Sequence, residues 1–284
     1  MKIIRLFTIL TLFISCNNSI EEKNPILFSE KNYDEAFQLI EYWLNAQKDY
    51  ENLPGLTAMV GDKEGVIWAQ AFGMANEQDV MSVENTFSIC SISKLFTAIA
   101  IMKLVEEQKI KLEDPIGELL PWFDLNQQFK DSPPLTIKSI LTHSSGLPRE
   151  SNHPYWSWPD FPFPTKEDVI NQLKNQEMLY PSSKYYQYSN LGLSLLGYVV
   201  EEVSGETFDN YVTKNILAPL NMNSTKTYMS KEEYGEKLSV GYSSINRERE
   251  REKVNFFNAD GITAAAGFTS VSYTHLRAHE TSID

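Results

Sequence analysis

A serine and a lysine three residues apart have a spacing that indicates chemistry. Ser91 and Lys94 begin an apolar stretch in which Leu95, Ala98 and Ile99 recur at helical spacing. Side chains at positions i and i+3 of a helix share one face, so the lysine amine can reach the serine hydroxyl. A neutral lysine can accept the hydroxyl proton if burial or nearby cations lower its pKa. The pair is therefore a candidate nucleophile and base.

The position of Ser91 in its helix also favours attack on a carbonyl. The turn sequence Glu84-Asn85-Thr86 predicts that the helix begins close to Ser91. The first helical turn carries free backbone N–H groups and the positive end of the helix dipole, which stabilise an oxyanion. Because S-x-x-K is a short pattern that usually has no catalytic meaning, its neighbours must decide the question.

Two more candidate residues occur near position 190. Tyr188 and Asn190 are separated by one residue and project from the same side of an extended turn. The tyrosine can relay a proton, and the asparagine can hold a substrate amide and orient the lysine. We interpret His143 as a hydrogen-bonded structural residue, because the chain has no G-x-S-x-G motif for a Ser-His-Asp triad. Cys90 is interpreted as a small packed residue and not as a reactive thiol.

The elements expected to position these residues alternate between helices and strands. We expect a hairpin with a tight turn over residues 61–65, which feeds an antiparallel sheet. A loop rich in proline and aromatic residues either walls a substrate pocket or packs on the surface, and Thr165 caps the helix after it. The expected helices cover residues 33–47, 191–203 and 208–220, the strands cover 56–60 and 66–72, and the loop covers 152–164.

Composition and charge narrow the class of protein. The chain has 284 residues, of which 42% are hydrophobic, and this is enough for a sizeable core. Its formal net charge is −13, with Lys and Arg scattered along the chain, so we expect no nucleic-acid partner.

The first residues predict export. A basic start, a short apolar run and a small residue before Cys16 are typical of a signal peptide over residues 1–16. The end of this run resembles a bacterial lipobox, so we expect Cys16 to carry lipid and residues 17–32 to form a polar tether at a membrane surface. A simple cleaved signal is the alternative. With Cys16 lipidated, Cys90 has no disulfide partner within the chain.

Three motifs together resemble the serine β-lactamase and penicillin-recognising hydrolase superfamily, closest to its class C-like branch. They are F-S-I-C-S-I-S-K-L-F-T-A at 87–98, L-T-H-S-S-G-L-P at 141–148 and Y-S-N at 188–190. The resemblance covers about residues 56–270. It implies an α+β fold, in which an antiparallel sheet flanked by helices adjoins an all-helical region. It also implies an acylated nucleophile at Ser91, proton transfer by Lys94 and Tyr188, a substrate contact at Asn190, and no cofactor or metal.

The C-terminal part of the sequence departs from this pattern. Neither K-T-G nor H-x-G follows Asn190, although these motifs supply the second oxyanion donor in the family. Residues 271–284 resemble a translated sequencing adapter, so we expect an incomplete hydrolase domain at 33–270 and give His275 and His279 no functional weight. Losing one oxyanion donor typically slows a reaction by about a hundred- to a thousandfold. We therefore expect this chain to be inactive and poorly folded as written.

The sequence predicts a serine hydrolase that acts through an acyl-enzyme on an amide or ester. The substrate can be a β-lactam, a D-amino-acid peptide or a small ester, and the residue pattern leaves these open. The alternative is a non-catalytic sensor domain that binds penicillin or peptidoglycan fragments. The presence of all four residues, Ser91, Lys94, Tyr188 and Asn190, favours the enzyme.

Overall fold

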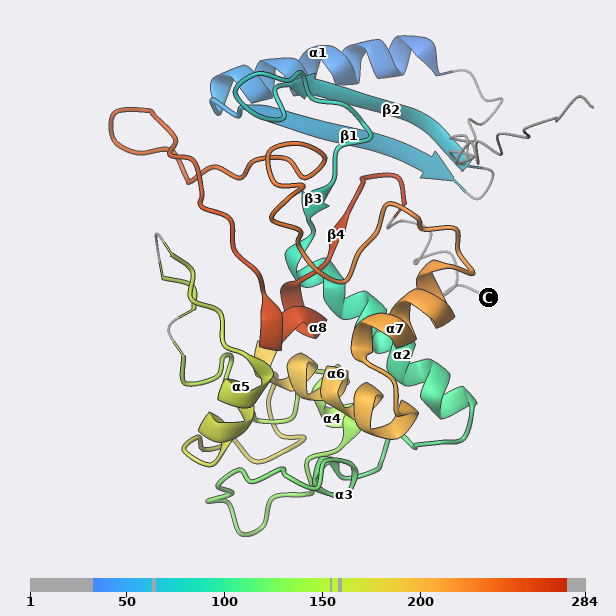
Figure 1. Cartoon of the computed structure of the whole chain (residues 1–284), viewed down its shortest axis with the longest axis vertical. Coiled ribbons are helices and arrows are strands. Elements are labelled where there is room, and N and C mark those ends of the chain that lie inside the picture. The colour runs from blue at the N-terminus through green and yellow to red at the C-terminus, as the bar shows by residue number, and fades with distance from the viewer. Residues whose placement is uncertain (1–32, 63–64, 154, 158–159, 275–284) are drawn as a thin grey trace, which may run out of the picture.

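The computed structural model describes residues 33–62, 65–153, 155–157 and 160–274. The expected signal, the lipidation site at Cys16 and the tether therefore lie outside the described residues, as do His275 and His279. The described part is an α+β fold, in which one helix and a hairpin form a layer above a larger helical region (Figure 1). The predicted fold class is confirmed.

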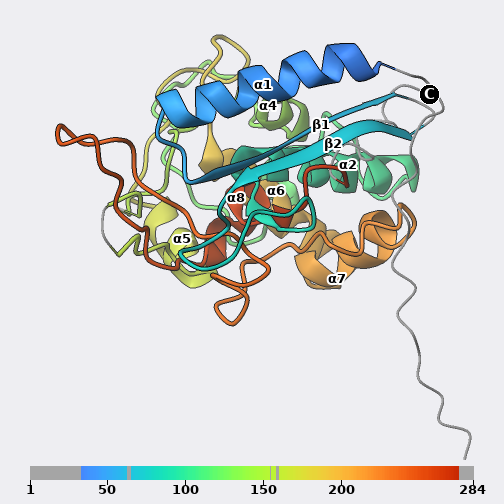
Figure 2. The same ribbon diagram turned by 90° about the horizontal axis from the view of Figure 1, so that it is seen from above.

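The upper layer consists of one helix packed along one antiparallel hairpin (Figure 2). Phe37 of the helix stacks on Trp68 of the second strand with ring centroids 5.4 Å apart. A β-bulge between Val60 and Gly61 shifts the strand register near the turn. The elements are α1 (Asp34–Tyr50), β1 (Gly55–Asp62) and β2 (Gly65–Gly73), close to the predicted ranges.

The lower region is built around α6 (Asn190–Ser204), in which every residue from Asn190 to Val200 is buried. This helix starts at a Ser189 side-chain cap and ends at Gly205, whose φ of +71° suits glycine. The other helices are α2 (Ser93–Glu106), α3 (Ile116–Leu119), α4 (Ile137–Leu141), α5 (Lys166–Leu173), α7 (Phe208–Val212) and α8 (Thr263–Ala266).

Shorter elements connect these helices. A 3₁₀ turn, Cys90–Ile92, leads directly into α2, and another, Asp260–Ile262, leads into α8. Two short strands, β3 (Phe87–Ser88) and β4 (Thr269–Ser270), pair antiparallel beside them. This pairing holds the segment just before Ser91 beside the segment around Thr269, although the two are far apart in the sequence.

The helix expected over residues 208–220 is interrupted. The α-helix ends at Val212, and a wider π-helical turn, Thr213–Leu217, follows it. Pro219 lacks a backbone N–H, and its ring crowds the carbonyl four residues earlier in a regular α-helix. The wider turn just before this proline avoids that conflict.

Three polar side chains on α2 hold the backbone of the α8 segment. A short helix such as α8 leaves backbone carbonyl and N–H groups without partners inside the helix. Hydroxyl and amine groups of α2 form hydrogen bonds with these backbone groups. The bonds run from Thr97 Oγ1 to Ala264 O (2.6 Å), from Lys94 Nζ to Ala265 O (2.7 Å) and from Phe268 N to Ser93 Oγ (3.1 Å). The position of Lys94 therefore depends on a segment about 170 residues away.

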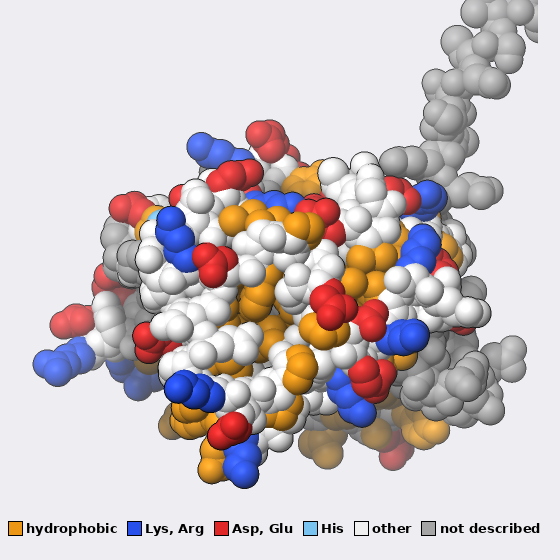
Figure 3. All heavy atoms as spheres, turned by 90° about the horizontal axis from the view of Figure 1, so that it is seen from below, with side chains coloured by type: hydrophobic (Ala, Val, Ile, Leu, Met, Phe, Trp, Pro, Cys, Tyr) orange, Lys and Arg blue, Asp and Glu red, His pale blue; other side chains and the backbone are white. Residues whose placement is uncertain are grey.

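The surface below the helical region carries charges of both signs. Figure 3 shows acidic and basic side chains interspersed around hydrophobic side chains in the middle of this face. Within the part of the chain that the structure describes, no helix is both long and apolar enough to span a membrane.

Candidate active site

The structure brings three of the four predicted site residues together at the start of α2. Tyr188 OH donates a hydrogen bond to Ser91 Oγ at 2.8 Å, and Lys94 Nζ lies 3.2 Å from the same oxygen. Ser91 belongs to the 3₁₀ turn before α2 and is exposed, so a substrate can approach its hydroxyl. The expectation that the helix begins near Ser91 is confirmed. A hydroxyl, an amine and a phenol thus meet at one accessible point.

Lys94 lies in surroundings that favour its neutral form. Burial is the main cause that lowers the pKa of its amine below the ordinary value of 10.5, and the nearby Arg149 charge acts in the same direction. The hydrogen bond with Tyr188 and the Glu150 carboxylate oppose that shift. Because the lowering prevails, Lys94 is better suited to accept a proton than an exposed lysine.

Tyr188 is held by a histidine and an arginine. The His143 ring packs against the tyrosine ring with centroids 4.5 Å apart, and its Nδ1 accepts the backbone N–H of Ser189 at 3.2 Å. The Arg149 guanidinium lies 5.1 Å from the centroid of the tyrosine ring. His143 is hydrogen-bonded, as expected, and its ring packs against the ring of Tyr188.

Asn190 is not joined to the other three residues. Its side chain is buried, with 3% of the residue exposed, and Nδ2 donates to Glu150 Oε1 at 2.7 Å. Its Oδ1 is buried and has no hydrogen-bond partner among the described residues. A buried amide oxygen without a donor is costly, and the structure does not show the predicted substrate contact at Asn190.

Sequence reasoning missed two groups that shape this site. The Ala265 carbonyl accepts from Lys94, but a backbone carbonyl leaves no signal in the residue types. Glu150 holds Asn190 and also accepts from Tyr155 and Trp156 in the aromatic loop. In the sequence, only the position of Glu150, two residues after the Gly-Leu-Pro turn at 146–148, could have indicated that it lies near the site. The loop is therefore tied to the Asn190 end of the site.

The prediction that Cys90 is a packed residue is wrong. Its side chain is exposed, and its φ of +44° lies in the left-handed region. The turn that presents Ser91 requires this conformation, which glycine adopts without cost and other residues adopt with strain.

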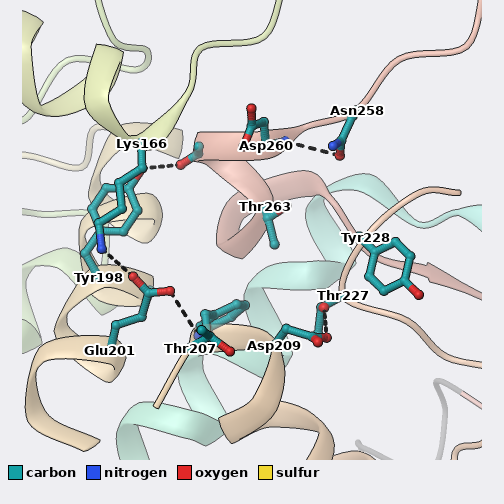
Figure 4. Close-up of a pocket in the computed structure, with 13 residues that line it drawn as sticks. Lys166, Tyr198, Glu201, Thr207, Asp209, Thr227, Tyr228, Asn258, Asp260 and Thr263 are labelled. Atoms are coloured by element: carbon teal, nitrogen blue, oxygen red, sulfur yellow. Dashed lines mark hydrogen bonds and ion pairs between the residues drawn. The ribbon is translucent and has the colours of Figure 1, made fainter. Parts of the chain in front are cut away.

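A separate cavity of about 340 Å³ lies beside α8 (Figure 4). Lys166 and Glu201 face each other across one side and form an ion pair, and Thr227 donates to Asp209 on another. Thr263 of α8 also lines this cavity. None of the predicted site residues lines this cavity. Lys166 is already paired with Glu201, and Thr227 with Asp209. We therefore place the candidate site at Ser91.

Comparisons with known proteins show what the chain is similar to. Beta-lactamase-like protein 2 of Dictyostelium discoideum is 27% identical to the chain over 230 residues, which are 78% of this chain and 41% of that protein. Penicillin-binding protein 4* of Bacillus subtilis is 27% identical over 176 residues, 61% of this chain and 38% of that protein. The chain thus spans about two fifths of the length of these curated relatives.

A solved structure extends the similarity to three dimensions. The octameric penicillin-binding protein homologue from Pyrococcus abyssi superposes with a TM-score of 0.73 at 28% identity, covering 87% of this chain and 57% of that one. The sequence profile of the Beta-lactamase family matches residues 43–271, which include Ser91, Lys94, Tyr188 and the segment that holds the lysine. The chain therefore belongs to the Beta-lactamase family.

Proposed function

We propose that the chain is a serine hydrolase that acts through an acyl-enzyme, with Ser91 as the nucleophile. The observation that carries this proposal is the meeting of Lys94 Nζ and Tyr188 OH at Ser91 Oγ, at 3.2 and 2.8 Å. Family membership and the lowered pKa of Lys94 support it. Within the family we propose the class C-like branch, which the three sequence motifs support.

The proposed reaction has two stages. Neutral Lys94 takes the Ser91 hydroxyl proton while Oγ forms a bond with the substrate carbonyl carbon, which gives a tetrahedral oxyanion. Collapse of this intermediate breaks the bond to the leaving amine or alcohol, and Tyr188 delivers the proton that the leaving group requires. Water then attacks the ester on Ser91 by the reverse proton transfers, releases the acid and restores the hydroxyl.

The proposed substrates are a β-lactam, a D-amino-acid peptide or a small ester, since each presents a carbonyl with a suitable leaving group. Export and lipidation at Cys16, as predicted from the sequence, would bring the site to peptidoglycan-derived compounds.

Covalent labelling of Ser91 tests this proposal without requiring turnover. The full chain is treated with a fluorescent fluorophosphonate or a fluorescent penicillin, and the labelled peptide is identified by mass spectrometry. We expect one label on Ser91 and its complete loss in Ser91→Ala, whereas Ser88→Ala, in the neighbouring strand, keeps the label. Equal labelling of Ser91→Ala and the natural chain would refute the proposal, and labelling without any hydrolysis would favour the sensor domain.

The pH dependence of labelling tests the role of Lys94. The amine must be neutral to act, so the labelling rate should rise with pH and reach half of its maximum below 10.5, in the direction of the lowered pKa. Lys94→Met should lower the rate by about a hundredfold or more and remove the pH dependence. A rate that depends equally on pH in both proteins would exclude Lys94 as the base.

A further inference from the structure

Arg149 is a largely exposed arginine that reaches the candidate site. Its side chain is 63% exposed, yet the central carbon of its guanidinium lies 5.1 Å from the centroid of the Tyr188 ring. The hydroxyl of that ring donates to Ser91 Oγ at 2.8 Å. A long, exposed side chain is ordinarily free to change its rotamer, so a contact with the site requires something that holds it there.

The Tyr188 ring is held by its neighbours and not by deep burial. The residue is only partly buried, and its ring lies against the His143 ring (4.5 Å), the Lys94 amine (4.9 Å) and the Arg149 guanidinium. The face of an aromatic ring attracts cations. A lysine that acts as a base is neutral, whereas a guanidinium stays charged, so Arg149 supplies the lasting cation at this ring.

A fixed carboxylate holds the arginine over the ring. Arg149 Nε lies 3.3 Å from Glu150 Oε1. The Glu150 side chain is only 22% exposed and accepts hydrogen bonds from Tyr155 OH, Trp156 Nε1 (3.1 Å) and Asn190 Nδ2 (2.7 Å). Because these donors fix the carboxylate, it is a firm anchor for one end of the guanidinium, and the other end stays near the ring.

The backbone of Arg149 holds the segment that carries the tyrosine. Its carbonyl accepts the N–H groups of Asn190 (2.7 Å) and Leu191 (3.2 Å), which a helix cannot pair at its own start. Ser189 Oγ donates to the Pro148 carbonyl at 2.6 Å. These bonds do not involve the arginine side chain. A substitution at this position therefore removes the contact with the ring and leaves the backbone anchor in place.

We propose that Arg149 is a positioning residue, whose guanidinium holds the Tyr188 ring so that the phenol hydroxyl stays at Ser91 Oγ and can protonate the leaving group. This inference rests on the proposed acylation of Ser91. An arginine can donate from Nε to Glu150 while the rest of its guanidinium lies over the ring, whereas the single ammonium of a lysine can occupy only one of these positions.

The test compares two esters that leave the same acetyl group on Ser91. p-Nitrophenyl acetate releases a weakly basic phenolate that departs without a proton, whereas phenyl acetate releases a more basic one that benefits from protonation. The first turnover of the full chain is followed as release of the phenol, and mass spectrometry locates the acetyl group. We expect the ratio of the phenyl acetate rate to the p-nitrophenyl acetate rate to fall by about three- to tenfold in Arg149→Met and in Arg149→Lys.

The pH dependence of fluorophosphonate labelling separates the charge of Arg149 from its contact with the ring. Three charged or titratable side chains act on the Lys94 amine, and the lysine charge acts on a fourth: Tyr188, Glu150, Arg149 and His143. Arg149→Met removes a cation that lowers the pKa of Lys94, so labelling should reach half of its maximum at a higher pH. Arg149→Lys keeps the cation and should keep this midpoint, although its ester ratio falls.

Lys138→Met is the matched control. The Lys138 side chain is also 63% exposed and also pairs with a carboxylate, Glu113, at 3.8 Å. This variant should change neither the ester ratio nor the pH midpoint. A change as large as that in Arg149→Met would show that the loss of any surface cation has this effect, which would overturn the inference.

A double-mutant cycle shows whether Arg149 acts through Tyr188. In a Tyr188→Phe background, Arg149→Met should lower the ratio no further, because the proton donor is already gone. A further fall in that background, or an unchanged ratio in Arg149→Lys, would overturn the inference. Should Arg149→Met not fold, Arg149→Lys by itself must lower the ratio, or the inference fails. Absence of labelling at Ser91 in the natural chain would instead refute the proposed function.

Discussion

The two layers of this molecule differ in how completely they bury their residues. In the helical region, α6 is buried without interruption from Asn190 to Val200, and α2 buries both apolar and polar side chains. In the upper layer no residue of α1 is buried, and every residue of β2 is partly exposed. The candidate site lies in the well-buried helical region, which therefore determines its geometry. The groups that contact Ser91 and Lys94 come from α2, α8 and the turn before α6.

The same difference is visible in the exposed side chains. Leu39, Tyr42 and Trp43 of α1 are 69%, 77% and 58% exposed. The contact between α1 and the hairpin includes the stacked rings of Phe37 and Trp68 and a hydrogen bond from Trp68 Nε1 to Glu41 Oε1 at 2.9 Å. Substitutions in the two layers should therefore have very different effects on stability.

The largest effect is expected for Phe96→Ala. The Phe96 side chain is fully buried in α2, and its ring stacks on Phe268 with centroids 5.0 Å apart. Removing it should cost about 3–5 kcal/mol of unfolding free energy, a large share of the total for a domain. Urea unfolding measures this loss. Phe37→Ala in α1 should lose less than half as much, and equal losses would show that the upper layer is as firmly packed.

An intermediate effect is expected for Gly197→Ala. Within a helix this change normally stabilises by about 0.5–1 kcal/mol, but at Gly197 a new Cβ would lie 2.5 Å from Ala264 Cβ of α8. We expect a loss of about 1–3 kcal/mol and slower labelling of Ser91, because α8 carries the carbonyl that holds Lys94.

Gly117→Ala is the matched control for this change. The nearest atom to a Cβ at that position, outside its own helix and chain neighbours, is Phe123 Cδ1 at 3.7 Å, an ordinary contact. In thermal melts of both variants, Gly117→Ala should leave the stability unchanged or raise it slightly. Stabilisation by Gly197→Ala would mean that α6 and α8 are not tightly packed against each other.

The smallest effect is expected for Leu39→Ser. Since this side chain is already 69% exposed, little apolar area returns to water on unfolding and the free energy should change by less than about 0.5 kcal/mol. Chemical denaturation of the purified variant measures it. A loss above about 2 kcal/mol would show that α1 buries this residue in solution and would remove the contrast between the layers.

The sequence predicted the parts of the fold and site that depend on local spacing. The i, i+3 relation placed Ser91 and Lys94 together, and the hairpin, α1 and α6 followed from periodicity and turn residues. The contact of Tyr188 with Ser91 joins residues 97 positions apart and came from the family resemblance. The Ala265 carbonyl and the link from Glu150 to Asn190 depend on packing between distant segments. The exposure of Cys90 depends on a backbone torsion that its residue type does not disclose.

His143 can exist in only one neutral tautomer in this fold. The backbone N–H of Ser189 donates to Nδ1, so the ring proton of the neutral form must be on Nε2. Burial and then the Lys94 charge lower the pKa of the ring below its ordinary value of 6.5. The neutral ring therefore contributes stability that is present above about pH 6.5 and is lost as the pH falls through the lowered pKa. A second proton on Nδ1 would displace the backbone N–H of Ser189, which lies between Tyr188 and Asn190, so protonation of His143 would break a hydrogen bond that holds the segment carrying both residues.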